Sequence, residues 1–350
     1  MHFGQFNLMG YRHRGTGPHE VFDLAVDQVK VAEQAGFEIA WFAEHHFSNY
    51  SICPSPLMMV ARLAGETRRI RLGPAVVVAP LYNPARLLAE VGMVDSLTHG
   101  RLVLGLGSGY QAYEFDRFGE DLAEAPARLV ELTQMLDLAF VNDTFSYDGQ
   151  HLKLPLSHIA TRPYAGLPEI WYAGENPGLL RLAASRGAPL MLSVRHYSVE
   201  LMCQARARVE AVWREVDAPL ESMRLAFLRP MCIVDTRAEA DVFLENLRHQ
   251  MRLSHGLRAR EQDLDRGMLR ETPYAGEPDM AALGRHLLVG DAETVAERLV
   301  AEIIAARPHH YLLQFQVGGL DGKVALRSIE RFASEVRPRL EKTLGPLDRL

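Results

Sequence analysis

A (β/α)8 barrel in a single α/β domain is the fold class that the sequence predicts, and three observations support it. Short apolar segments rich in β-branched and aromatic residues alternate with segments of helical periodicity, as in parallel strands joined by crossover helices. About eight strand segments can be counted, which is the number that closes such a barrel. The chain has 350 residues, against about 250 for a typical barrel, so residues 1–350 can form one domain with one or two insertions.

The predicted strands share a short apolar core followed by a polar or glycine-containing turn. In chain order they are Phe3–Leu8, Ile39–Ala43, Ile70–Val78, Arg101–Leu106, Glu169–Tyr172, Pro189–Ser193, Leu225–Val234 and Tyr311–Gln316.

Helix boundaries are marked by capping residues. The first helix follows Gly17-Pro18 and ends at Ala35-Gly36, where glycine can adopt a left-handed conformation. Three later helices begin with a capping side chain followed by proline, which is favoured at the first helical position. These starts are Ser55-Pro56, Asn83-Pro84 and Asn176-Pro177, and further helices are predicted over Met202–Val216, Ala238–Met251 and from Asp321 to about Leu340.

Two stretches interrupt the alternation of strands and helices. Residues 142–167 contain the hairpin-like pair Asp148-Gly149 and scattered prolines, and residues 254–286 are polar and rich in Arg and Glu. Long irregular segments in a compact domain are commonly lids or binding loops. We therefore expect a hairpin insertion and a mobile, lid-like insertion over one face of the barrel.

A doubly wound open sheet is the competing fold, because it too alternates strands and helices. The segment Gly105-Leu106-Gly107-Ser108-Gly109 follows a strand and resembles a dinucleotide-binding loop. The match is poor, since that fingerprint requires G-x-G-x-x-G and an immediate helix, whereas residues 110–121 are aromatic, acidic and interrupted by Gly119.

Composition and charge narrow the class of protein. With 48% hydrophobic and 23% charged residues the chain has the composition of an ordinary globular protein. A net charge of −6 offers no general attraction for polyanions, which argues against nucleic acid or an acidic membrane as the main partner. The sequence shows no run approaching eighteen apolar residues and no signal-peptide pattern, and its three widely spaced cysteines suggest neither disulfides nor a zinc site. A cytoplasmic location is expected.

The strongest catalytic candidate lies at the end of the second strand, in Trp41-Phe42-Ala43-Glu44-His45-His46-Phe47. Barrel active sites lie at the carboxyl ends of the strands, and an imidazole beside a carboxylate can transfer protons near neutral pH. A metal site or a hydrogen-bonded structural pair are the alternatives for this motif.

Two further segments could approach a ligand. Glycines 105, 107 and 109 would let a flat ring approach the fourth strand, although a bulge or tight barrel corner explains them equally well. At the fifth strand, Gly174-Glu175-Asn176-Pro177-Gly178 opens a helix whose free amides could hold a phosphate.

Taken in order, these segments resemble the bacterial luciferase-like flavin monooxygenases over nearly the whole chain. The resemblance rests on Ala43-Glu44-His45-His46-Phe47, on the run Ile70-Arg71-Leu72-Gly73-Pro74-Ala75-Val76-Val77-Val78-Ala79-Pro80, and on Asn83-Pro84-Ala85-Arg86 with Asp95-Ser96-Leu97-Thr98-His99-Gly100-Arg101.

The resemblance implies a barrel that binds FMN at its open end, with no metal. His45 matches the catalytic histidine of the family, with Glu44 beside it. Ala75-Val76 matches a non-prolyl cis peptide that packs against the flavin. Further cofactor-binding candidates are Gly107, Ser108, Tyr110, Glu175, Asn176, Gly178 and Leu179, and the candidate substrate pocket comprises Phe6, Leu8, Trp41 and Phe47.

The chain also departs from the pattern of the family. Where bacterial luciferase carries a cysteine and then a phosphate-binding arginine, this chain has Gly107 and Ser108. Light emission from an aldehyde is therefore not expected, and Arg195, after the sixth strand, is a candidate replacement ligand for the phosphate.

The sequence-based hypothesis is a monooxygenase that uses O2 and reduced FMN from a separate NAD(P)H-flavin reductase to oxygenate a small organic substrate. The lid would exclude water and His45 would act as general acid or base. The alternatives are a deazaflavin-dependent hydride-transfer oxidoreductase and a non-catalytic flavin-binding subunit. A homodimer is expected from the resemblance.

Overall fold

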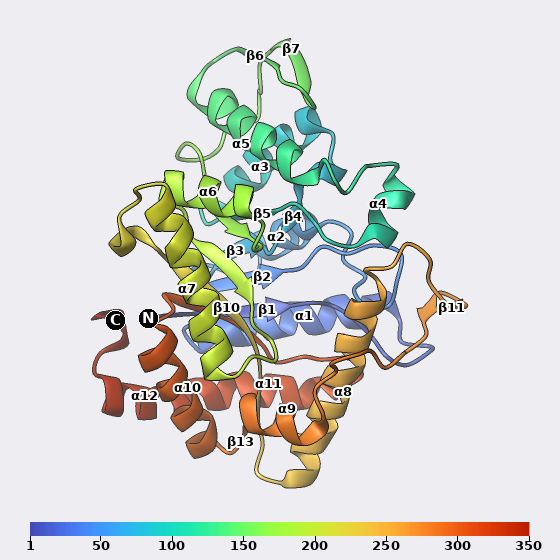
Figure 1. Ribbon diagram of the computed structural model, residues 1–350, viewed down its shortest axis with the longest axis vertical. Coiled ribbons are helices and arrows are strands. Elements are labelled where there is room, and N and C mark those ends of the chain that lie inside the picture. Colours follow the sequence, from blue (N-terminus) through green and yellow to red (C-terminus); the bar gives the residue numbers. More distant parts are fainter. Residues whose placement is uncertain (350) are drawn as a thin grey trace.

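The computed structural model describes residues 1–349 and consists of a parallel barrel surrounded by helices (Figure 1). The main sheet has ten strands in the order β3-β2-β1-β14-β10-β9-β8-β5-β4, with β13 paired to β10. β3 and β4 are halves of one interrupted strand, and β13 pairs only with the last residues of β10, so eight strand positions remain in the barrel. A parallel bridge between Leu72 of β3 and Leu102, just before β5, brings the two ends of the sheet together. The predicted barrel is confirmed.

The strands agree with the prediction to within one or two residues at most ends. They are β1 (His2–Asn7), β2 (Ile39–Phe42), β3 (Arg71–Pro74), β4 (Val77–Val78), β5 (Val103–Gly107), β8 (Glu169–Ala173), β9 (Leu190–Ser193), β10 (Leu225–Ile233), β13 (Leu288–Gly290) and β14 (His310–Gln314).

The helices cover the outside of the barrel. They are α1 (Pro18–Gln34), α2 (Pro56–Ala64), α3 (Pro84–Thr98), α4 (Ala112–Phe118), α5 (Ala125–Val141), α6 (Pro177–Arg186), α7 (Val199–Glu215), α8 (Arg237–Gly256), α9 (Met280–His286), α10 (Ala292–Ala306), α11 (Gly322–Arg331) and α12 (Arg337–Leu344). None of the helices in residues 1–349 combines the length and apolarity that crossing a membrane requires.

Two of the three predicted capping side chains make the expected bonds. Asn83 accepts from the amide of Arg86, and Asn176 accepts from the amides of Gly178 and Leu179. Ser55 precedes the proline of α2 without capping it through its side chain. Proline occupies the first turn in all three helices, where its missing N–H costs no hydrogen bond.

The prediction of one continuous strand over residues 70–78 is wrong. A cis peptide joins Ala75 to Val76 and separates β3 from β4. The cis bond itself was expected from the resemblance, but the run of alanine and valine from Ala75 to Ala79 continues through it and conceals the break. The final helix is also divided, since a π-helical turn over Phe332–Val336 lies between α11 and α12.

The expectation that both insertions cover one face of the barrel is wrong for residues 142–167. This segment does contain the predicted hairpin, formed by β6 (Phe145–Asp148) and β7 (Lys153–Ser157). It joins the end of α5 to the start of β8 and lies well away from the strands (Figure 1). Arg162 donates to the carbonyls of Ala139 and Phe140 at the end of α5. A helix-to-strand connection lies at the amino-terminal end of the barrel, opposite the expected active-site face.

Residues 254–286 contain more regular structure than expected. They include the last turn of α8, a short hairpin of β11 (Leu264–Asp265) and β12 (Met268–Leu269), and α9. The amide of Leu269 donates to Asn49, and Arg260 pairs with Asp116 at 2.6 Å. Asn49 lies in the loop after β2 and Asp116 in α4 after β5, so this insertion does lie over the active-site face.

Candidate active site

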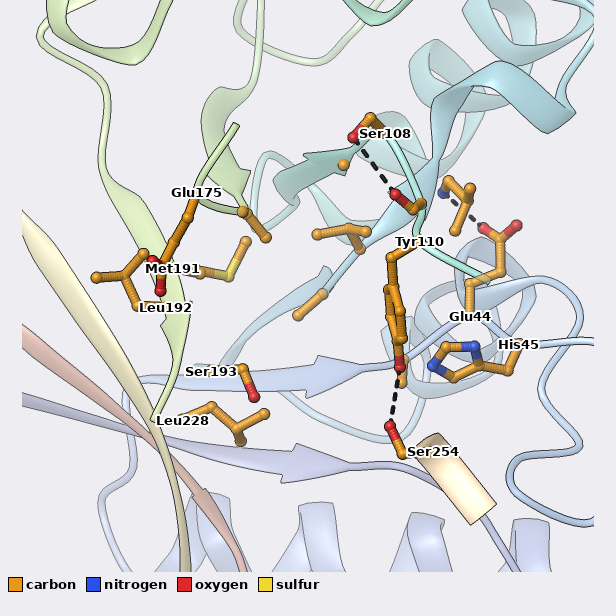
Figure 2. Close-up of a pocket in the computed structure, with 18 of the residues that line it drawn as sticks. Glu44, His45, Ser108, Tyr110, Glu175, Met191, Leu192, Ser193, Leu228 and Ser254 are labelled. Carbon is orange, nitrogen blue, oxygen red and sulfur yellow. Dashed lines mark hydrogen bonds between the residues drawn. The ribbon is translucent and has the colours of Figure 1, made fainter. Parts of the chain in front are cut away.

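A cavity of about 640 Å³ opens at the carboxyl ends of the strands. Its wall combines apolar side chains with a small set of polar ones, as in most small-molecule sites. Figure 2 shows Tyr110 standing between His45 and the residues of β9, with Ser254 of α8 below it. The lining includes the predicted residues Phe6, Glu44, His45, Ala75, Val76, Gly107, Ser108, Tyr110, Glu175 and Asn176.

His45 is held against the cavity by Glu114, a carboxylate of α4. The Nδ1 atom of His45 lies 3.2 Å from Oε1 of Glu114, and the same oxygen accepts a 2.6 Å bond from the amide of His46. Both side chains are buried. Burial alone would lower the pKa of His45, but the charge of Glu114 and its hydrogen bond outweigh burial and raise the pKa above its ordinary value. The pair can hold and release a proton beside the cavity.

Glu44 has both carboxylate oxygens engaged by neighbouring groups. Oε1 lies 3.0 Å from Nε2 of His46, while Oε2 accepts from the amide of Val78 and, at 2.8 Å, from the hydroxyl of Tyr82. Burial raises the pKa of Glu44 above its ordinary value, although the hydrogen bond and charge of His46 act to lower it. Because these bonds tie the end of β2 to β4, the geometry favours a positioning role for Glu44 in the predicted catalytic motif.

Arg195 and Tyr50 form a second polar group beside His45. The Nη1 atom of Arg195 donates a 2.9 Å bond to the hydroxyl of Tyr50, whose ring lies 4.8 Å from that of His45. Burial would raise the pKa of Tyr50, but the positive charges of Arg195 and His45 outweigh it and lower the pKa to about 8. Tyr50 was not recognised in the sequence, although it lies only five residues after His45.

The glycines that end β5 make room for the neighbouring strand. A Cβ on Gly107 would lie 2.6 Å from the side chain of Val76, and one on Gly105 would lie 2.1 Å from the carbonyl of Pro74. These glycines therefore let β5 pack tightly beside the interruption between β3 and β4. Ala75 and Val76 then present an apolar wall to the cavity.

The start of α6 forms the other end of the cavity. Glu175 and Asn176 line it, while Gly178 and Leu179 do not. Asn176 Oδ1 accepts from the amides of both Gly178 and Leu179, at 2.9 and 3.4 Å. The two amides expected to hold a phosphate are thus bonded to the cap of their own helix.

Three predicted pocket residues lie outside the cavity lining. Trp41 is fully buried in the barrel interior, with its ring 5.1 Å from that of Trp171, and Leu8 is also buried. Phe47 has a positive φ and packs beside Phe118 on the surface, where half of it is exposed. Inward-facing barrel positions are filled by large side chains below the mouth, which explains why Trp41 serves the core.

Several lining residues were missed because they lie on elements without a motif. Glu114 lies in the acidic segment after β5. Ser254 lies on α8, much later in the chain. The missed residues of the cavity include Glu114, Met191, Leu192, Ser193, Leu228, Ser254, Arg258 and Leu312.

We expect Glu114→Gln to lower the pKa of His45. The variant keeps an oxygen that can accept from the amide of His46 but removes the charge that stabilises the imidazolium against burial. An NMR titration of the imidazole, assigned by its loss in His45→Gln, measures the change. Glu120→Gln, which alters a carboxylate paired with Arg128, is the control. An unchanged pKa of His45 in Glu114→Gln would show that the carboxylate does not set it.

The fold and the site define an α/β-barrel protein with a buried histidine-carboxylate pair beside an open, mainly apolar cavity. The chain belongs to the luciferase-like monooxygenase family, whose model matches residues 1–309. It is 37% identical to an uncharacterized protein of Sinorhizobium fredii over 99% of both chains. It is 24% identical to the oxygenase component of the flavin-dependent trigonelline monooxygenase of Acinetobacter baylyi, over 93% of this chain and 91% of that one.

Solved structures show the same fold at low sequence identity. The monooxygenase RslO1 from Streptomyces bottropensis superposes with a TM-score of 0.82 at 20% identity, covering 97% of this chain and 99% of that one. An F420-dependent secondary alcohol dehydrogenase superposes with a TM-score of 0.74 at 17% identity, covering 97% of this chain and 98% of that one. The predicted family membership and barrel fold are confirmed.

Proposed function

We propose that this protein is the oxygenase of a two-component system, which uses O2 and reduced FMN from a separate reductase to oxygenate a small organic substrate. The observation that carries the proposal is the His45–Glu114 pair, which places a proton-transferring imidazole beside the apolar cavity. The relative from Acinetobacter baylyi, named as an oxygenase component, supports the two-component arrangement.

The residues that line the cavity fit FMN. The apolar wall of Ala75 and Val76 suits the flat ring system, and the cavity volume of about 640 Å³ is within the range of cofactor sites. Ser108 suits the phosphate end, and the dipole of the nearby α6 favours an anion there, although the amides of Gly178 and Leu179 are bonded to Asn176. The hydroxyl of Ser108 makes only a long 3.5 Å contact with the carbonyl of Gly109, so it can donate to a ligand.

When bound, reduced FMN would supply the electrons that activate O2. The protein would orient the substrate against the apolar wall, and residues 254–286 would limit the access of water. His45 would give or take a proton at Nε2, because Glu114 occupies its Nδ1 side. A deazaflavin-dependent dehydrogenase is the second candidate, since such an enzyme shares the fold. We also expect a cytoplasmic homodimer.

A reconstituted reaction tests the function. Purified protein is mixed with a flavin reductase, NADH, FMN and isotopically labelled O2, and products are analysed by mass spectrometry over a panel of small organic compounds. The proposal predicts one labelled oxygen atom in a product, formed only when the reductase is present. Hydride transfer to or from F420 without incorporation of oxygen would instead support the dehydrogenase.

We expect Ser108→Ala to weaken binding of FMN while leaving binding of riboflavin nearly unchanged. Loss of one hydrogen bond to a charged phosphate should reduce affinity by about tenfold. Calorimetric titration of the oxidised flavins measures both affinities. Equal losses for the two flavins would mean that Ser108 does not face the phosphate.

A further inference from the structure

Arg195 is a cation in the cavity wall that has no carboxylate partner among the residues that the structure describes. Its single side-chain bond within residues 1–349 is the one from Nη1 to the neutral hydroxyl of Tyr50, and its Nε atom is buried without any partner. The carboxylates that line the cavity are engaged elsewhere: Glu114 with His45, Glu44 with His46, and Glu175 with Arg208. A partly buried guanidinium left in this state favours an anionic occupant.

The guanidinium of Arg195 lies across the barrel mouth from the expected phosphate end. Arg195 follows β9, but its Nη1 reaches Tyr50 after β2, and its Cζ lies 6.0 Å from the ring of Phe6 on β1. In the closed order of the sheet, β1 lies opposite β8, which leads into α6, and three positions from β5, which Ser108 follows. The guanidinium of Arg195 therefore lies on the same side of the cavity as His45, where a substrate rather than the phosphate of FMN would bind.

The backbone of Arg195 is fixed by a second, fully buried arginine. Arg229 of β10 donates from Nη1 to the carbonyls of Val194 and Tyr197, on either side of Arg195, at 2.8 and 3.2 Å. Arg258 adds another positive charge at the mouth, with its Cζ 5.8 Å from the ring of Tyr110 and no ion pair within residues 1–349. The cationic side of the cavity is thus built on a loop that Arg229 holds in place.

We propose that Arg195 binds an anionic group of the organic substrate, so that the enzyme acts on small organic acids. The free Nη2 of Arg195 would hold a carboxylate, with the hydroxyl of Tyr50 donating beside it, and the adjacent carbon skeleton would lie between His45 and the apolar wall. This inference rests on the proposed function for the reaction itself. Its binding step can be measured without the reaction.

The first experiment compares acids with neutral isosteres on the free protein. Calorimetry is run with benzoate, phenylacetate and hexanoate, each against its amide, for the wild type, Arg195→Gln and Arg195→Lys. We expect at least one acid to bind about tenfold more tightly than its amide. The preference should be lost in Arg195→Gln and partly kept in Arg195→Lys, because lysine retains the charge but lacks the planar fork. Absence of any acid preference, or its persistence in Arg195→Gln, would overturn the proposal.

The second experiment asks whether Arg195 holds the cofactor instead. The ratio of FMN to riboflavin affinity is measured in Arg195→Gln, with Ser108→Ala as the matched control. We expect the ratio to be unchanged in Arg195→Gln and to fall in Ser108→Ala. A fall in Arg195→Gln would assign the guanidinium to the phosphate and overturn the proposal. If the wild type binds neither flavin, the proposed oxygenase function fails while the acid-amide comparison still decides the role of Arg195.

Discussion

Replacing His45 by glutamine should reduce kcat/KM for oxygenation by about a hundredfold to ten-thousandfold, the usual contribution of a positioned acid or base. Glutamine can still bond to Glu114, so the carboxylate keeps a partner, but it cannot transfer a proton at the cavity. Affinity for FMN should change little because the ring is expected to pack on Ala75 and Val76. The assay is the reconstituted oxygenation described above.

His46→Gln is the matched control for this prediction. His46 adjoins His45 in the sequence, but its Nε2 atom bonds to Glu44 and it does not line the cavity. The control should retain most of its activity once the thermal midpoint confirms that it is folded. Equal activity of His45→Gln and His46→Gln would remove His45 from the mechanism.

Replacing Arg229 by leucine should lower the free energy of unfolding by about 3–5 kcal/mol, as expected when a buried ion pair loses one partner. Arg229 is 0% and Glu302 1% exposed, and Arg229 Nη2 lies 2.5 Å from Oε1 of Glu302. Arg229 also donates to the carbonyl of His286, which ends α9, so the same side chain joins the lid-like insertion to the barrel. Chemical denaturation of wild type and variant measures the loss.

The destabilisation by Arg229→Leu should increase with pH. Burial raises the pKa of Glu302 above its ordinary value, although the positive charge of Arg229 acts to lower it. Removal of that charge should therefore raise the pKa of Glu302 further. A carboxyl whose pKa is higher in the folded than in the unfolded state reduces stability as pH rises from the unfolded toward the folded value. Adding Glu302→Gln should therefore recover part of the stability and remove this pH dependence.

Arg224→Leu provides the comparison for a partly exposed arginine just before the same strand. Its pair with Glu169 is 3.2 Å long and both side chains are about one-third exposed, at 39% and 30%. A loss of about 0–1 kcal/mol is expected there. A similar loss in Arg229→Leu and Arg224→Leu would contradict the structural role assigned to the buried pair.

The barrel could be predicted from the sequence because its determinants are local. Buried parallel strands such as β2 and β9 are short, mainly apolar runs, and helices such as α3 and α6 carry capping residues at their starts. The interruption between β3 and β4 could not be inferred from composition, since valine and alanine continue through it. Only the family resemblance indicated the cis peptide there.

Site residues that belong to a sequence motif could be predicted, whereas those brought together from elements far apart in the sequence could not. His45 and Glu44 belong to a recognisable segment, whereas Glu114 reaches His45 across 69 residues of sequence and Arg195 reaches Tyr50 across 145. Such contacts depend on the direction of side chains in the closed barrel. For the same reason, Trp41 was assigned to the pocket although the barrel interior encloses it.

If this protein is the proposed oxygenase, reduced FMN binds in the cavity beside His45. Anaerobic titration of the purified protein with reduced FMN, followed by calorimetry and repeated with F420, tests it most directly. The proposed function predicts saturable binding of reduced FMN that is tighter than binding of F420 and is weakened in Ser108→Ala. Binding of F420 without binding of reduced FMN would contradict the oxygenase assignment.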